Sequence, residues 1–117
     1  MSNQNIYLKY SSSLQWSSTE SGPYVDVGPN SPSTGVEGGD TITFIAVSGI
    51  DKIQKISDGL NGTKKLIKSK KGEDSNTVIA TIDGTVNPGD IDKYEIKFKP
   101  DHGGSITVDP EIEVKGT

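Results

Sequence analysis

The sequence contains no cysteine and no arginine, and only 6% of its residues are aromatic. Without cysteine the chain holds no disulfide, zinc–thiolate site, iron–sulfur cluster or catalytic thiol. All twelve Lys/Arg positions are lysine, whereas bidentate binding of phosphate or guanine normally uses arginine. Because the net charge is also −4, we do not expect the protein to bind nucleic acid.

Long apolar segments are also missing. No run approaches the roughly 20 apolar residues that a membrane-spanning helix needs, so we do not expect membrane insertion. The first residues, MSNQNIYLKY, have neither the basic nor the apolar region of a signal peptide. We therefore expect a cytoplasmic protein, or an exported one if the chain is a trimmed precursor. Asn61-Gly62-Thr63 matches a glycosylation acceptor, which we expect to be fortuitous without an export signal.

The sequence is rich in glycine, and its apolar and polar residues alternate with a period of two. The chain has 14 glycines among 117 residues, and 30% of its residues are hydrophobic. This composition indicates a thin core and many turns. The length favours one domain spanning residues 1–117. No window shows sustained helical periodicity.

The predicted strands follow from the alternation of apolar and polar residues. The clearest lies at 93–99, where Tyr94, Ile96 and Phe98 alternate with charged residues. Residues 41–47 are apolar on both faces, which predicts a strand near the middle of a sheet. Residues 50–56 fit either a bulged strand or one helical turn. Other strands are predicted at 6–10, 14–16, 24–27, near 66, at 77–83 and at 103–116, and residues 57–63 are predicted to turn.

These strands recur at intervals of roughly ten residues with turn residues between them, which is typical of a sandwich or barrel. We predict an all-β fold, a single antiparallel Greek-key β-sandwich of about seven or eight strands. Pro110 lies inside the last predicted strand and cannot donate a ladder hydrogen bond. The period-two alternation continues across the proline, because Val108 and Ile112 both fall on even positions. We therefore expect one extended run with a bulge or a change of partner strand at Asp109-Pro110.

Two phrases place glycine and aspartate ahead of a predicted strand, GGDTITF at 38–44 and PGDIDKYEIKF at 88–98. With GSITV at 104–108, they resemble the cupredoxin-like sandwich, in which Gly-Asp often precedes a central strand and a similar hairpin ends the domain. The resemblance covers mainly residues 38–47 and 77–115. Immunoglobulin-like sandwiches produce similar patterns, so both topologies are open. Apart from the resemblance, the repeated Gly-Asp is explained by two ordinary turns that each lead into a strand.

The resemblance implies the fold without the family's copper chemistry. A type 1 copper site needs two histidines, a cysteine and usually a weak axial ligand such as methionine. This chain has one histidine, His102, and no cysteine. We therefore expect no copper, no electron transfer and no cofactor.

Trp16, with Tyr10 and Tyr24, is the best candidate for a ligand platform. These aromatic residues lie in or beside a segment rich in serine and glycine, and aromatic rings stack on sugars or bases. The alternative is that Trp16 fills one end of the core, as a lone tryptophan commonly does.

Two other groups of titratable residues are weaker candidates. Asp90 and Asp92 lie two residues apart and are the candidates for a calcium site, although capping and turn hydrogen bonds explain such acids as well. His102 beside Asp101 is either a general base or a solvated turn residue, and the sequence shows no nucleophile near it.

The chain has one basic block, which either steers an anionic partner or keeps a hairpin edge from pairing. It consists of Lys64, Lys65, Lys68, Lys70 and Lys71.

The sequence predicts a non-catalytic protein that acts as an interaction or structural module, and not an enzyme. One alternative is a module that binds a small ligand or a carbohydrate through Trp16 and the nearby tyrosines. A second alternative is a calcium-dependent binding module. The sequence specifies neither the protein or carbohydrate partner nor the oligomeric state.

Overall fold

The computed structural model describes residues 2–28, 33–60 and 62–115. These residues form eleven strands in two sheets and contain no helix, which confirms the all-β prediction. Accordingly, no helix in the described ranges is long and apolar enough to cross a membrane. Residues 29–32 of the Ser/Gly-rich segment and Asn61 of the glycosylation acceptor lie outside the described residues.

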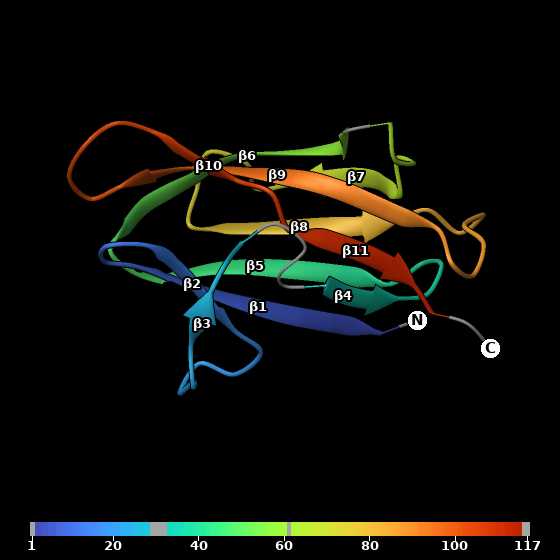
Figure 1. The fold of residues 1–117 in the computed structure, drawn as a ribbon, viewed down its shortest axis with the longest axis horizontal. Coiled ribbons are helices and arrows are strands. Elements are labelled where there is room, and N and C mark those ends of the chain that lie inside the picture. The colour runs from blue at the N-terminus through green and yellow to red at the C-terminus, as the bar shows by residue number, and fades with distance from the viewer. Residues whose placement is uncertain (1, 29–32, 61, 116–117) are drawn as a thin grey trace.

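The first sheet has six strands in the order β3-β2-β1-β5-β8-β7 (Figure 1). β5 lies between β1 and β8, as its two apolar faces predicted. β1 and β5 run parallel, and the other pairs of this sheet are antiparallel. The bounds are β1 (Asn3–Tyr10), β2 (Leu14–Ser17), β3 (Val25–Asp26), β5 (Thr41–Ser48), β7 (Ile67–Lys71) and β8 (Thr77–Ile82).

The second sheet is built around β9, which pairs with β10 and β11 along one edge and with β6 along the other. β11 also pairs with β4, in parallel. Each sheet thus contains one parallel pair, so the sheets are mixed and not antiparallel throughout. The bounds are β4 (Ser33–Val36), β6 (Ile50–Leu60), β9 (Ile91–Pro100), β10 (Ile106–Val108) and β11 (Glu111–Val114).

The inward faces of the two sheets share one hydrophobic core, which is the arrangement of a sandwich. Alternate residues of β9 point into it, and Tyr94 and Phe98 are fully buried as predicted. The rings of Phe44 from β5 and Tyr94 from β9 meet edge to face, with centroids 5.8 Å apart. Burying each large apolar side chain stabilises the fold by about 1.5–3 kcal/mol, so this small core depends on nearly complete burial.

β6 is the bulged strand that was one of the two predictions for residues 50–56. Its register with β9 shifts at three places. Its free edge is covered by the β7–β8 hairpin, because Lys70 donates to the carbonyl of Ile56 and Glu73 accepts from the amide of Ile56. β6 extends to Leu60, so the predicted turn begins later than expected.

The structure corrects the prediction for Asp109-Pro110. β10 and β11 pair with the same edge of β9. The register is the same on both sides of the proline, since Ile106 lies opposite Phe98 before it and Glu111 lies opposite Lys93 after it. Neither pairing contains a bulge, and the amide of Tyr94 donates to the carbonyl of Pro110. Pro110 therefore removes one hydrogen bond from an otherwise continuous pairing. What changes beyond it is the opposite edge, where β11 gains β4 as a second neighbour.

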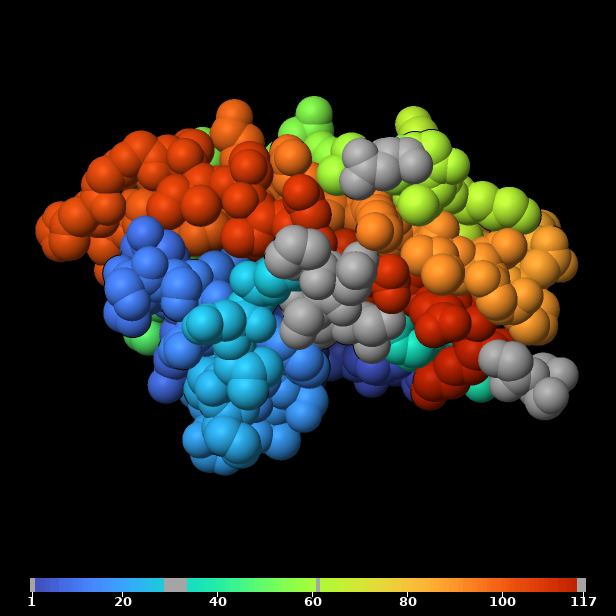
Figure 2. Space-filling model, in the orientation of Figure 1, coloured from blue at the N-terminus to red at the C-terminus, as the bar shows by residue number. Residues whose placement is uncertain are grey.

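The strands place three connections at one end of the sandwich (Figure 1). The β1–β2, β5–β6 and β9–β10 connections lie at this end, whereas β1 begins and β11 ends at the other. The segment between β2 and β3 projects from the body of the molecule (Figure 2). The end with the three connections holds the candidate site.

Candidate functional site

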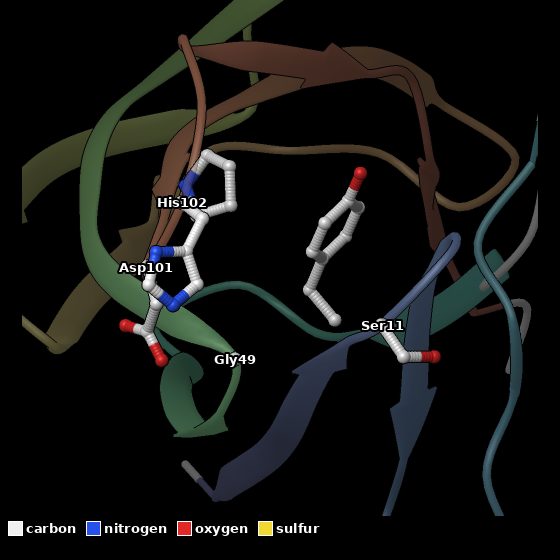
Figure 3. A pocket seen from close by; sticks show the side chains of 6 residues that line it. Ser11, Gly49, Asp101 and His102 are labelled. Atoms are coloured by element: carbon white, nitrogen blue, oxygen red, sulfur yellow. The ribbon is translucent and has the colours of Figure 1, made fainter.

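A hollow of about 250 Å³ opens between these three connections (Figure 3). Ser11 lies on one side of it, and Asp101 and His102 lie on the other (Figure 3). The lining residues are Tyr10, Ser11, Gly49, Pro100, Asp101 and His102.

Gly49 allows the three connections to come this close. Its φ is +76°, and a Cβ added to it would lie 1.8 Å from the carbonyl oxygen of Tyr10. Only glycine combines this backbone conformation with such an approach. The carbonyl of Gly49 accepts the amide of Asp101 at 3.1 Å, which ties the β9–β10 connection to the β5–β6 connection.

Tyr10 is held from behind by the core, because its ring lies 5.3 Å from the ring of Phe98 at 60°. Tyr10 is half-buried, whereas Ser11, Asp101 and His102 are exposed. The lining therefore combines an aromatic ring with a hydroxyl, an imidazole and a carboxylate. Such a set can pack against an apolar ring face and exchange hydrogen bonds with hydroxyl groups at the rim.

The side chains of the hollow do not form a positioned catalytic set. Among the described residues, no hydrogen bond or ion pair connects His102 to Asp101 or to Ser11. A general base normally has a partner that fixes its orientation within hydrogen-bond reach of the nucleophile.

The three predicted aromatic residues lie in different places, and only Tyr10 lines the hollow. Trp16 packs against the core, and its indole nitrogen is buried without a hydrogen-bond partner among the described residues. Tyr24 lies on the outside, where its ring covers the ammonium of Lys9 at 4.3 Å and its hydroxyl donates to the carbonyl of Glu20.

Asp92 is fully buried, and its carboxylate accepts hydrogen bonds from backbone amides. Its two carboxylate oxygens accept the amides of Gly59 at 2.6 Å and Leu66 at 2.9 Å. Burial raises the pKa of Asp92, and these two hydrogen bonds oppose the rise. Asp92 therefore joins β6 to the segment before β7.

Asp90 accepts the amide of Asn87 and pairs with the ammonium of Lys64 at 3.1 Å. The Asn87 hydrogen bond and the Lys64 contact lower the pKa of Asp90. Both calcium candidates therefore already bind donors of the chain. The described ranges contain no group of three or more His, Cys, Asp or Glu side chains that could hold a metal ion.

The lysine block divides in the structure. Lys64 pairs with Asp90, and Lys70 reaches across to β6, where it binds the carbonyl of Ile56 and lies 3.7 Å from Asp58. Lys65, Lys68 and Lys71 are exposed. The structure thus spreads these lysines over the edge strand β7 and the residues before it.

Sequence reasoning named Tyr10, Asp101 and His102 for separate reasons but did not bring them together, and it missed Ser11, Gly49 and Pro100. Gly49, between two predicted strands, was the available signal, since such a glycine often marks close backbone approach. A scan of the chain against models of protein families gives no match, and a search of curated protein sequences gives none either.

Proposed function

We propose that the protein is a non-catalytic binding module and that the hollow takes a small neutral ligand with several hydroxyl groups, such as one sugar unit. The observation that supports this proposal is the convergence of Tyr10, Ser11, Asp101 and His102 on one hollow from three connections. Aromatic faces and hydroxyl-binding side chains together are what a sugar ring requires.

The chemistry of the lining selects against other ligands. No lysine lines the hollow and Asp101 adds a negative charge, so an anionic ligand is disfavoured. A volume of about 250 Å³ lies below the roughly 300–1,000 Å³ of drug-sized sites, which suits a single ring. The interaction is expected to be weak, because the hollow is open and its polar groups are exposed.

For the scaffold, we propose a cupredoxin-like Greek-key sandwich without copper. The supporting observation is that both Gly-Asp turns lead into inner strands, β5 in one sheet and β9 in the other. Copper is not part of the proposal, because the chain has no cysteine and one histidine.

The test is a titration of the ¹⁵N-labelled protein with single neutral monosaccharides, followed by amide chemical shifts. We expect saturable shifts confined to Gly49, Asp101, His102 and their neighbours. Asp101→Asn should weaken binding at least about fivefold, since the carboxylate accepts hydroxyl protons more strongly than an amide does. The matched control is Asp109→Asn, because Asp109 is an exposed acid between β10 and β11 that does not line the hollow; this variant should leave the affinity unchanged. The proposal is overturned if no sugar shifts these amides or if the shifts map elsewhere.

A further inference from the structure

Four lysines lie together on the outer face of the second sheet. The residues of β9 point alternately into the core and away from it, so Lys97 and Lys99 point outward. Lys97 lies directly opposite Lys55 of β6, and Lys99 lies opposite Lys52. We call these four residues the lysine quartet. It forms two rows of two ammonium groups across the β6–β9 pair in a chain whose net charge is −4.

The row nearer the hollow has acidic partners. Lys52 pairs with the carboxylate of Asp74 at 2.9 Å. Lys99 lies 3.9 Å from a carboxylate oxygen of Asp51. These two lysines are therefore partly neutralised by the chain itself.

The second row, Lys55 and Lys97, has no such partner. Both residues are exposed, and neither forms an ion pair with a described residue. Glu95, the next outward residue of β9, lies opposite Ser57, one row further from the hollow. Like charges directly opposite each other on neighbouring strands destabilise a sheet. An anionic group bound between the two ammonium groups would remove this repulsion.

We infer that the lysine quartet binds the acidic groups of a polysaccharide. This inference rests on the proposed function, because it takes the partner to be a sugar chain, and it names the class of that chain. Asp101 repels an anion from the hollow itself. The unit in the hollow is therefore neutral, and the acidic groups belong to the units beside it.

The two strands that carry the quartet both lead to the hollow. β6 begins directly after Gly49, and β9 ends at Pro100, and both of these residues line the hollow (Figure 1). Strands rise about 3.4 Å per residue, so Lys97 lies about 10 Å along β9 from Pro100. A sugar chain with one unit in the hollow would then place the acidic groups of neighbouring units on the quartet.

The side chains around the quartet fit a hydrated sugar chain better than other anionic partners. Ser105 donates to the side-chain oxygen of Gln54 at 2.5 Å, so the Gln54 amide keeps N–H donors for sugar hydroxyls. The two described rows contain no aromatic or apolar side chain, whereas protein interfaces and membrane-binding surfaces concentrate such residues. The chain also has no arginine, which disfavours nucleic acid.

The test is a titration of the ¹⁵N-labelled protein with two acidic sugar chains, heparin fragments, which are sulfated, and polygalacturonate fragments, which are carboxylated. We expect saturable amide shifts at Lys55 and Lys97 with at least one of them. Two bound acidic groups predict an affinity that falls about tenfold between about 50 and 200 mM salt. Polyglutamate and DNA fragments of equal charge should bind at least about fivefold more weakly.

The double variant Lys55→Gln/Lys97→Gln should weaken binding of the sugar chain at least about tenfold, since it removes both unpaired ammonium groups. Its melting temperature should be unchanged or higher, because the repulsion between the two lysines is gone. Lys68→Gln/Lys71→Gln is the matched control. It removes the same charge from exposed lysines of β7 and should change the affinity less than about twofold.

The hollow and the quartet can fail separately in this experiment. If neutral monosaccharides bind but neither acidic chain does, the quartet inference is overturned and the proposed function stands. If an acidic chain binds through the quartet but no monosaccharide binds, the proposed hollow is overturned and the quartet stands. Equal binding of polyglutamate or DNA overturns the inference, and so does an equal loss of affinity in the two double variants.

Discussion

The turns at residues 37–40 and 87–90 have the same backbone geometry but different surroundings. In both, the fourth residue is aspartate, its amide donates to the carbonyl of the first residue at 3.1 Å, and its carboxylate accepts the first residue's amide. The third residue is glycine with φ of +85° or +88°, as in a type II turn. Gly39 then donates to Ile82 and Gly89 to Val114, each the last residue of a neighbouring strand.

The second carboxylate oxygen marks the difference between the turns. In Asp40 it accepts the amide of Ser2 at 2.8 Å, and the residue is 4% exposed. In Asp90 it meets the ammonium of Lys64, whose side chain is 64% exposed. The same local sequence therefore makes a buried link in one sheet and, in the other, an ion pair between an exposed lysine and a half-buried aspartate.

The largest predicted effect that separates the turns comes from Asp40→Ala. It removes the buried carboxylate that accepts the amides of Ser2 and Glu37, which should lower the free energy of unfolding by about 1–3 kcal/mol. Urea denaturation of the two variants in parallel measures this. Asp90→Ala is the control and should cost less, because Asn87 and the Lys64 side chain, which lose the carboxylate, are exposed and can bind water instead. Equal losses would show that burial does not distinguish the two turns.

A smaller effect should be common to both turns. Gly89→Ala places a side chain at φ of +88°, where its Cβ meets no atom within 4 Å. Only backbone strain then opposes the substitution, so we expect a loss of about 1–2 kcal/mol, measured by thermal unfolding. Gly89→Asn is the control, since asparagine tolerates this conformation better, and it should recover part of the loss. An unchanged melting temperature for Gly89→Ala would contradict the type II geometry.

The smallest effect is a change in acid stability. Burial alone would raise the pKa of Asp40, but the hydrogen bonds from Glu37 and Ser2 outweigh it and lower the pKa. The charged form then stabilises the fold above the unfolded pKa of about 4, and this stabilisation is lost as the pH falls through the folded value. The stability gap between wild type and Asp40→Asn should therefore narrow in acid, measured by urea denaturation at several pH values.

Asp92 provides the opposite case for the same experiment. Its pKa is raised by burial, so its contribution is most favourable below the unfolded pKa and is lost as the pH rises through the folded value. The stability of wild type relative to Asp92→Asn should therefore improve in acid. Parallel pH profiles for the Asp40 and Asp92 variants would contradict both assignments.

Local pattern was sufficient for the strands with clean alternation. β5 and β9 were predicted closely, because Phe44 and Tyr94 sit in runs where every second side chain is apolar. β4 was missed, since Ser33–Val36 is short and offers only Val36 as a large apolar residue. The predicted bulge or change of partner strand at Asp109-Pro110 was wrong with respect to β9, because a proline is tolerated where the partner strand continues to donate to its carbonyl.

The candidate site was predicted only in pieces. Tyr10, Asp101 and His102 were each singled out, but Tyr10 is ninety residues from the loop that it faces. Their convergence depends on the close approach of Gly49 to the backbone of Tyr10, which involves residues far apart in the chain. The parallel pairs β1–β5 and β4–β11 were unpredicted for the same reason, since alternation specifies a face and not a neighbour.

By itself the sequence determined the all-β class, the positions of most strands, the Gly-Asp turns and the absence of a type 1 copper site. These properties follow from residue types and from a period of two along the chain, which act locally. Only the tertiary structure decided which strands are neighbours, which aspartate is buried and which side chains surround the hollow. Those depend on contacts between distant segments, whose free energy comes from burial that no short stretch of sequence contains.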